Sequence, residues 1–353
     1  DAWDRGSGNK VTIAIVDTGI DHQSGDIHED LKGRYTSGRN IVADPDDNKP
    51  WDTDSHTHGT HCSGIAAALA NNNIGIAGVT GSESSFSNIE LMAVKVLGPG
   101  GGTASDVSDG ITWAADHDAD VISMSLGCYH HFSEIEDACN YAFNQQDCVL
   151  VAAAGNDHYN LDNPPQGQHY PSGYDSVISV AATNSQNKLA SFSNYGGNTV
   201  DLAAPGEHIW SCAGNNGYRY LSGTSMACPH VAGVAAIARA RNPSMSAEEI
   251  RQKLFDTADK IGPEGDQWIY GRVDATLDGG GEEPDEMPTI TVHIDKLSND
   301  CDDDTLPEGG GGLDAIDIPN LPEWFYEIEV IEGEKTQSVK KYALEKIEFT
   351  DST

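Results

Sequence analysis

The segment DTDSHTHGTHC, residues 52–62, concentrates the side chains with the clearest capacity for chemistry in this sequence. His56, His58 and His61 lie close together along the chain, and Cys62 follows the last of them. Imidazole groups bind transition metals such as Zn²⁺, and they also exchange protons near neutral pH. The segment is therefore compatible with a zinc site, or with a general base that serves a nucleophile elsewhere in the chain.

The zinc hypothesis depends on the His-x-His-x-x-His spacing, which resembles that of the metallo-β-lactamase-like hydrolases. That family has an acidic ligand just before the last histidine, whereas this chain has Thr60. The glycine after His58 also begins a helical pattern, and a helix would aim His58 and His61 in different directions. These features disfavour zinc and make proton transfer the better interpretation.

A general base needs a nucleophile and a carboxylate that orients the imidazole. Ser225 offers a hydroxyl at a Gly-Thr-Ser turn that leads into an alanine-rich helical segment, where negative charge is favoured. Asp17 offers a carboxylate at the end of the apolar run VTIAIVDTG, where an unpaired charge would be costly. A single aspartate at the end of a strand is more often a turn residue, so the interpretation depends on the three groups occurring together.

Four blocks, DTGID, HGTHCSG, AAAGN and GTSMACPHVAG, resemble the motif blocks of the subtilisin-like serine proteases, the subtilases. They occur in that family's chain order of Asp, His and Ser, and the resemblance covers roughly residues 1–277. It implies that Asp17, His58 and Ser225 form a catalytic triad. It also implies a serine endopeptidase that hydrolyses peptide bonds in proteins through an acyl-enzyme intermediate.

The same resemblance assigns a supporting role to Asn156, which ends the block AAAGN and matches the family's oxyanion-hole asparagine. Thr57 is a departure, because the family usually has glycine before the catalytic histidine. A subtilase fold used only as a binding scaffold is the competing hypothesis. The complete set of triad residues together with Asn156 argues against it.

Substrate is expected to bind as an extended strand between LGPGGG (97–102) and SLG (125–127), through main-chain pairing. The alternative is that both are glycine-rich loops of no special role. The segment AAAG (152–155) would wall the first specificity pocket and QHYPSGY (168–174) would form its base, where a histidine replaces the family's common small residue. The implied substrate-binding residues are Gly100, Gly101, Gly102, Ser125, Leu126, Gly127, Ala152, Ala153, Ala154, Gly155 and His169.

Calcium is the cofactor that the resemblance implies, because LANNNIGIAG is similar to the family's calcium loop. Its expected ligands are oxygen atoms of Asp30, Asn72, Ile74 and Ile76, and oxygen ligands suit Ca²⁺. Two acidic segments remain ambiguous between a further calcium site and a solvated loop, namely DPDDNKPWDTD (44–54) and DCDDD (300–304).

An α/β fold with a doubly wound, mostly parallel sheet flanked by helices is expected for residues 1–277. Continuous apolar runs, rather than alternating ones, indicate buried parallel strands at 11–19, 89–98, 120–127, 148–156 and 176–183. Helical patterns lie at 59–72, 104–118, 133–146, 224–242 and 246–258, the last opened by a Ser246–Glu249 capping box. Sites in such sheets form beyond the carboxyl ends of the strands, where the motif residues lie.

The composition changes after residue 277. Residues 278–289 form an acidic linker rich in Gly and Pro, and residues 290–353 are expected to form a small acidic β-rich module. Alternating patterns at 289–297 and 324–333 and a strand candidate at 340–349 support this expectation.

The formal net charge of −36 repels nucleic acid and anionic membranes, which disfavours both as partners, and it suits binding of divalent cations. Such acidity resembles that of the halolysin-type subtilases and suits a saline medium, in which the Debye length shrinks to about 3 Å near 1 M salt. Simple solubility is the alternative explanation.

No run of 18 apolar residues is present, which argues against a membrane span, and the first residues carry no signal-peptide pattern, as expected of a cytosolic protein or of a sequence numbered after processing. The subtilase resemblance implies a secreted enzyme, here in a mature or trimmed form. Its expected partners are polypeptide substrates and its own propeptide, and the expected state is a monomer. The 7 cysteines are an odd number, and only Cys139 and Cys148 suggest a local bridge, so the pairing stays open.

Overall fold

The computed structural model describes residues 9–23, 26–42, 48–81, 88–261 and 266–278, together with three strands at 289–293, 326–332 and 335–341. The chain divides into two units, Asp1–Gly280 and Gly281–Thr353. The predicted acidic segment 300–304 lies outside the described residues, as does part of the segment 44–54.

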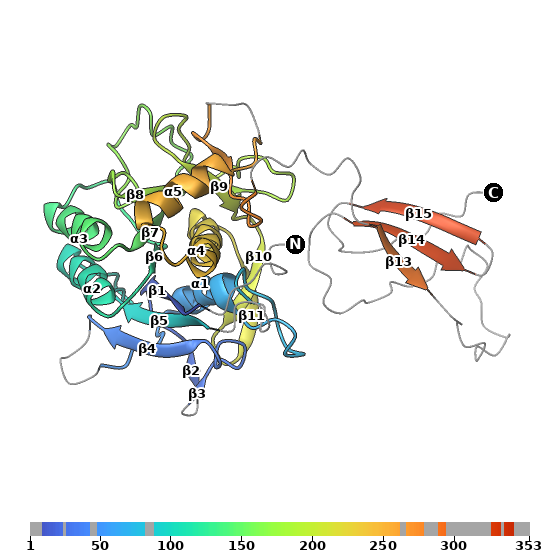
Figure 1. The fold of residues 1–353 in the computed structure, drawn as a ribbon, viewed down its shortest axis with the longest axis horizontal. Helices are drawn as coiled ribbons and strands as arrows, with labels where there is room; N and C mark the ends of the chain where they lie inside the picture. Colours follow the sequence, from blue (N-terminus) through green and yellow to red (C-terminus); the bar gives the residue numbers. More distant parts are fainter. Residues whose placement is uncertain are drawn as a thin grey trace. The chain divides into compact units, whose positions relative to one another are not determined.

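The first unit is built on an eight-stranded sheet whose neighbouring strands are all parallel (Figure 1). This finding confirms the doubly wound, mostly parallel sheet predicted from the sequence. In spatial order the strands are β12 (Gly271–Arg272), β9 (Leu202–Pro205), β8 (Val177–Thr183), β7 (Val149–Ala153), β6 (Val121–Met124), β1 (Val11–Asp17), β5 (Ile89–Lys95) and β4 (Tyr35–Asn40). Every residue of β1 is buried, because helices cover both faces of the sheet there.

In the described part of the chain, five helices flank the sheet and bury two separate cores against it (Figure 1). Helices α2 (Ala104–Asp116) and α3 (Ser133–Asn144) cover one face, and α1 (His58–Ala67), α4 (Thr224–Arg241) and α5 (Ala247–Asp256) cover the other. The predicted capping box is present at α5, where the Ser246 hydroxyl accepts from the Glu249 N–H at 3.2 Å and Glu249 Oε2 accepts from the Ser246 N–H at 2.8 Å. Helices α1 and α4 pack against each other, which brings two motif segments distant in sequence together.

Several strands were not predicted, and those of the large sheet lie at or next to its edges. Strands β4, β9 and β12 lie toward the two edges of the large sheet. Strand β4 has the sequence YTSGRN and is only partly buried, so it lacks the apolar run that marks an interior strand. The small antiparallel pairs β2 (His22–Gln23) with β3 (Asp26–Ile27), and β10 (Ile209–Ala213) with β11 (Gly217–Leu221), were also missed.

The second unit contains a three-stranded sheet. Strand β13 (Thr289–His293) runs parallel to β14 (Tyr326–Glu332), and β14 runs antiparallel to β15 (Lys335–Lys341). The first two strands fall within the predicted alternating patterns. The third begins earlier than the strand predicted at 340–349, and residues 342–349 lie outside the described part of the chain.

The suggested local bridge between Cys139 and Cys148 is not formed, because both cysteines are free. The Cys148 thiol donates instead to the Ala119 carbonyl oxygen at 2.9 Å. Burial raises the pKa of both thiols to about 12, so both are neutral at physiological pH and pack as small core side chains.

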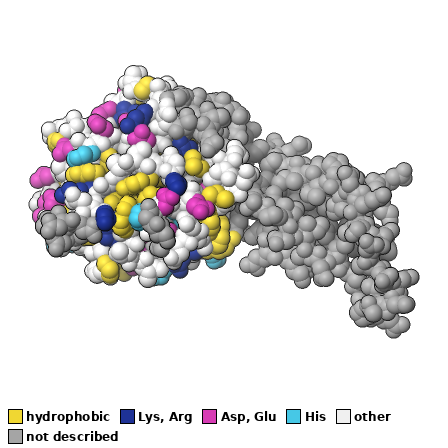
Figure 2. Space-filling model, turned by 90° about the horizontal axis from the view of Figure 1, so that it is seen from below, with side chains coloured by type: hydrophobic (Ala, Val, Ile, Leu, Met, Phe, Trp, Pro, Cys, Tyr) yellow, Lys and Arg dark blue, Asp and Glu magenta, His cyan; other side chains and the backbone are white. Residues whose placement is uncertain are grey.

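The surface of the described part of the chain is chemically mixed. On the face drawn in Figure 2, acidic and basic side chains lie scattered among apolar and neutral ones. Within the residues that the structure describes, no helix combines the length and the apolar character that crossing a membrane requires.

Candidate active site

Asp17 and His58 form a direct hydrogen-bonded pair at the carboxyl end of the sheet. Asp17 is the last residue of β1 and is fully buried, whereas His58 is the first residue of α1 and keeps 24% of its side chain exposed. His58 Nδ1 lies 2.8 Å from Asp17 Oδ1. Because a carboxylate only accepts, Nδ1 carries the proton, and Nε2 is left with its lone pair when the imidazole is neutral.

The backbone around this pair requires glycine after His58, and it holds the residue before His58 in an unusual conformation. Gly59 packs so tightly that a Cβ there would lie 2.3 Å from the Gly19 carbonyl oxygen and 3.2 Å from Asp17 Cβ. Thr57, the departure from the family pattern, has φ 51° and ψ 50°, a left-handed conformation that favours glycine. The Thr57 hydroxyl accepts from the Gly214 N–H at 2.9 Å, an interaction that glycine would lack.

The electrostatic surroundings hold a proton on His58. Burial of the imidazole opposes its charging, but the adjacent Asp17 carboxylate outweighs that effect and raises the pKa of His58 well above its ordinary value. Asp17 Oδ1 also accepts from the Thr18 N–H at 2.7 Å, while Oδ2 is buried without a hydrogen-bond partner among the described residues. His58 is therefore the titratable side chain that the carboxylate contacts directly.

Ser225 lies in the first turn of α4, close to the Asp17–His58 pair. The Cys62 sulfur lies 3.4 Å from the Ser225 carbonyl oxygen and 4.0 Å from His58 Nδ1, so it contacts both groups. Ser125 Oγ donates to the same carbonyl oxygen at 2.7 Å. Ser225 Oγ donates at 3.3 Å to the Ser125 carbonyl oxygen rather than to His58, a looser arrangement typical of an active site without substrate.

Asn156 is exposed just beyond β7, and its carboxamide is held from one side. Asn156 Oδ1 accepts from the Thr224 N–H at 2.8 Å and from the Thr224 hydroxyl at 3.1 Å. The Gly155 N–H donates in turn to Thr224 Oγ1 at 3.1 Å. These bonds use Oδ1 of Asn156, and among the described residues its Nδ2 makes no hydrogen bond.

The remaining histidines of the opening segment do not converge on a metal position. His61 is buried within α1, and its Nε2 lies 3.1 Å from the carbonyl oxygens of both Ile209 and Arg219. Burial lowers the pKa of His61 to about 4, so it is neutral at physiological pH. His56 is exposed, and its Nδ1 lies beside Ser55 Oγ at 3.2 Å. The zinc arrangement is therefore not supported by the geometry.

Comparison with known proteins identifies the family. The model of the subtilase family matches residues 8–273 of this chain. The chain belongs to the subtilase family of serine endopeptidases. Thermitase from Thermoactinomyces vulgaris is 44% identical over 275 residues, which are 78% of this subtilase and 90% of thermitase. A protease from Pseudoalteromonas arctica PAMC 21717 has a similar structure, with a TM-score of 0.69, 31% identity, and coverage of 78% of this chain and 91% of that one.

Other relatives are longer than the matched region. The halolysin-like extracellular serine protease Nep from Natrialba magadii is 39% identical over 279 residues, which are 78% of this subtilase and 49% of Nep. The thermophilic serine proteinase from Bacillus sp. strain AK1 is 44% identical over 276 residues, and the match spans 63% of its length. The matched part of this subtilase therefore spans about half to two thirds of the length of these longer relatives.

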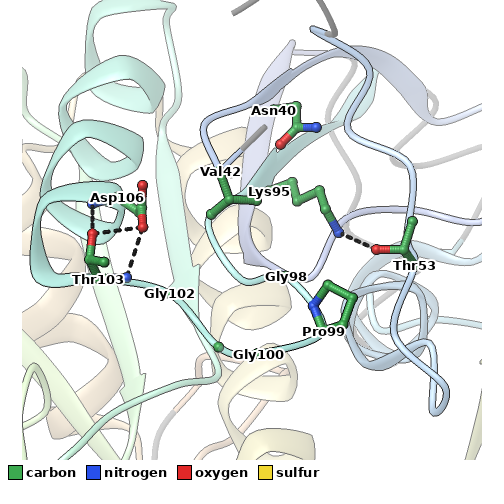
Figure 3. A pocket seen from close by; sticks show the side chains of 11 residues that line it. Asn40, Val42, Thr53, Lys95, Gly98, Pro99, Gly100, Gly102, Thr103 and Asp106 are labelled. Atoms are coloured by element: carbon green, nitrogen blue, oxygen red, sulfur yellow. Dashed lines mark hydrogen bonds between the residues drawn. The ribbon is translucent and has the colours of Figure 1, made fainter. Parts of the chain in front are cut away.

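Residues 98–102 of the predicted substrate segment 97–102 form one wall of a cavity of about 540 Å³ (Figure 3). Within it, Gly98 and Gly101 exchange N–H···O bonds of 2.9 and 3.0 Å, so the main-chain groups of Gly101 are occupied inside the turn. Gly100 and Gly102 lie outside those bonds. Lys95 enters the cavity from β5, and its Nζ donates to Thr53 Oγ1 at 3.1 Å.

Apart from His169, the other predicted substrate-binding residues lie at the ends of the adjacent strands β6 and β7 or directly beyond them. Ser125 is buried, Leu126 is half-buried and Gly127 is exposed. The side chains of Ala152, Ala153 and Ala154 pack into the hydrophobic cores, so their contribution to a pocket is limited to the backbone. His169 is 6% exposed and lies between Gly127 and Gly155, as described below.

The predicted calcium residues gather around one buried carboxylate. Asp30 accepts from Asn72 Nδ2 at 2.6 Å, from the Ile76 N–H at 2.9 Å and from the Tyr218 hydroxyl at 3.1 Å. Asn72 Oδ1 accepts from the Ile74 N–H at 3.1 Å, so the loop closes on itself. In the described part of the chain the donors to Asp30 are all neutral, which leaves its charge without a formal counter-charge. The side-chain oxygens of Asp30 and Asn72 are of the type that a hard divalent cation prefers, and in this structure they accept hydrogen bonds from neighbouring N–H and O–H groups.

Three supporting contacts escaped sequence reasoning. Thr224 orients Asn156, Ser125 Oγ holds the Ser225 carbonyl oxygen, and Cys62 packs between His58 and Ser225. The sequence offered one indication of these contacts: Thr224 lies inside the block GTSMACPHVAG and Cys62 inside the block HGTHCSG, next to the predicted triad residues. Their specific contacts depend on the packing of α1 against α4, which the sequence does not specify.

Proposed function

We propose that this subtilase is a serine endopeptidase in which Ser225 is the nucleophile, His58 the general base and Asp17 the carboxylate that orients it. The observation that carries the proposal is the 2.8 Å contact between His58 Nδ1 and Asp17 Oδ1, beside the first turn of α4, where Ser225 lies. That contact selects the tautomer whose Nε2 accepts a proton.

The reaction follows from these positions. His58 Nε2 takes the proton of the Ser225 hydroxyl as Oγ attacks the carbonyl carbon of the scissile peptide bond. The C–N bond then breaks, His58 returns the proton to the departing amine, and an ester to Ser225 remains. Water, deprotonated by His58, attacks the ester carbon; the bond from that carbon to Ser225 Oγ then breaks, His58 returns the proton to Oγ, and the carboxylic acid leaves. Positioned general acid–base catalysis contributes about 10²–10⁴-fold to such a rate.

Fluorophosphonate labelling followed by peptide mass mapping tests this assignment. We expect one covalent adduct on the peptide that contains Ser225, and its disappearance in the Ser225→Ala variant. Ser222→Ala is the matched control, because Ser222 is an exposed neighbour whose Oγ accepts only from the His208 N–H among the described bonds. An adduct that persists in Ser225→Ala would disprove the assignment.

Asn156 is proposed to stabilise the oxyanion through Nδ2, together with the Ser225 N–H. Asn156→Asp keeps an oxygen for Thr224 and removes the amide donor, so we expect kcat to fall about 10²–10³-fold with little change in KM. This range was measured for the equivalent loss in subtilisin. Steady-state kinetics on a peptide anilide check it, with Asn163→Asp, an exposed position in a nearby loop, as the control. A loss confined to KM would contradict the role.

Calcium is proposed to bind Asp30 and Asn72 through side-chain oxygens, and Ile74 and Ile76 through their carbonyls. The ion would supply the positive charge that the buried carboxylate lacks. At 100 times its Kd such an ion adds about 2.7 kcal/mol of stability, so we expect calcium to raise Tm by about 5 °C or more relative to chelator.

The readout is the calcium-dependent difference in Tm, measured by calorimetry. Asp30→Asn is expected to abolish that difference, while Asp109→Asn, which removes the same charge on the exposed surface of α2, is expected to retain it. An equal calcium response in both variants would locate the ion elsewhere.

The wider biology is proposed from the relatives and the composition. The relative Nep is called extracellular, and this chain combines 39% identity to it with a net charge of −36, which supports secretion into a saline medium. We propose residues 1–277 as the catalytic domain, 278–289 as a linker and 290–353 as an appended module. A propeptide before maturation and a monomeric state complete the proposal.

A further inference from the structure

The ends of β6 and β7 define a narrow gap beside the proposed nucleophile. The two strands are adjacent and parallel, so segments 125–127 and 154–155 leave the sheet side by side. Segment 125–127 lacks a side chain at Gly127, and segment 154–155 lacks one at Gly155, so the gap lies between these two glycines. If the proposed function holds, the substrate side chain before the scissile bond enters between them.

The imidazole of His169 already occupies this gap. A Cβ at Gly127 would lie 2.3 Å from His169 Cε1 and 2.8 Å from Nε2. A Cβ at Gly155 would lie 3.0 Å from Cδ2 and 3.1 Å from Nε2 of the same ring. One edge of the ring therefore spans from one glycine to the other, and both positions need glycine to accommodate it.

Neighbouring groups fix the ring in this position. The Tyr129 ring packs against it edge-on with centroids 5.2 Å apart, and His169 Nδ1 lies 3.0 Å from Ser172 Oγ. The backbone on either side is anchored, because Cys128 and Tyr170 exchange N–H···O bonds of 2.9 and 2.8 Å. Burial lowers the pKa of His169 to about 4, so the ring stays neutral above that pH and offers no charge to an acidic substrate.

We propose that His169 closes the first specificity pocket, so that this subtilase cleaves after small residues such as alanine, serine or glycine and discriminates against phenylalanine, tyrosine and leucine. The inference rests on the proposed function, since it concerns the same site. A ring held by Gly127, Gly155, Tyr129 and Ser172 cannot move aside without breaking several contacts, and rigid packing resists such displacement.

Peptide anilides that differ only in the residue before the scissile bond test the proposal. For the full chain we expect kcat/KM to be at least tenfold higher for alanine than for phenylalanine. His169→Gly opens the gap, and we expect the phenylalanine-to-alanine ratio to rise about 10–100-fold, the range by which a hydrophobic pocket discriminates side-chain size. His158→Gly is the matched control, because this histidine is exposed, has φ 55° and contacts Tyr195 instead. We expect it to leave the ratio unchanged.

The outcomes separate the two proposals. An unmodified chain that hydrolyses the phenylalanine peptide as well as or better than the alanine peptide overturns the pocket inference while leaving the protease assignment intact. A chain that hydrolyses no peptide in the series counts against the proposed function. If His169→Gly fails to fold, the preference of the unmodified chain alone decides, and an unchanged ratio in a folded His169→Gly variant refutes the role of the ring.

Discussion

Ser225→Ala is expected to lower kcat by about 10⁶-fold, the loss measured when the nucleophile of subtilisin is removed. The physical reason is that the alanine variant has no oxygen to form the acyl-enzyme, so only binding and oxyanion stabilisation remain. The fold is expected to persist, because among the described residues Ser225 Oγ makes one long hydrogen bond, of 3.3 Å, to the Ser125 carbonyl oxygen. Turnover of a peptide anilide and Tm measured on the same sample check both statements.

The variant His58→Ala, combined with Ser225→Ala, tests whether His58 and Ser225 act together in one catalytic step or independently. His58→Ala is expected to cost about as much as Ser225→Ala, and the double variant little more than either single one, because the two groups act in the same proton transfer. Losses that multiply in the double variant would show that the residues act separately. Ser222→Ala again provides the control for an unspecific effect of removing a nearby hydroxyl.

The second large effect concerns Asp17 and pH. His58 acts as a base only when it is neutral, so kcat/KM should rise as pH increases through the pKa of His58, which Asp17 raises well above its ordinary value. We therefore expect the rising limb of the pH profile, the range over which kcat/KM increases with pH, to lie at alkaline pH. Asp17→Asn removes the carboxylate and leaves burial, which lowers the pKa, so the limb should move to lower pH. The maximal kcat/KM should fall about 10⁴-fold, as in other triads, because the variant favours the wrong tautomer of His58.

The pH profile of kcat/KM for both forms measures this effect. Asp54→Asn is the matched control, because Asp54 precedes α1 and accepts from the His56 N–H at 3.0 Å without a hydrogen bond to His58. We expect its limb to coincide with that of the unmodified chain. A limb that stays in place in Asp17→Asn would mean that Asp17 does not set the pKa of His58.

The interior of the fold was predictable from the sequence for a physical reason. A strand covered on both faces needs apolar residues at every position, so β1, β5, β6, β7 and β8 were visible as continuous runs. Edge strands have no such requirement, and β4 with its sequence YTSGRN was missed. The polar strand β15 begins before the strand candidate at 340–349 and overlaps it at residues 340–341, because a strand with the sequence KTQSVKK carries a weak pattern; the rest of the candidate lies outside the described residues.

For the candidate site, the sequence determined which residue types occur and the order of the motif blocks along the chain. Only the tertiary structure decided that His58 Nδ1 contacts Asp17, that Thr224 holds Asn156, and that the ring of His169 lies between Gly127 and Gly155. These contacts join residues far apart in the chain, and they depend on how α1, α4 and the strand ends pack together. Local patterns specify each element, but a contact between two elements is an outcome of packing, and no local pattern encodes it.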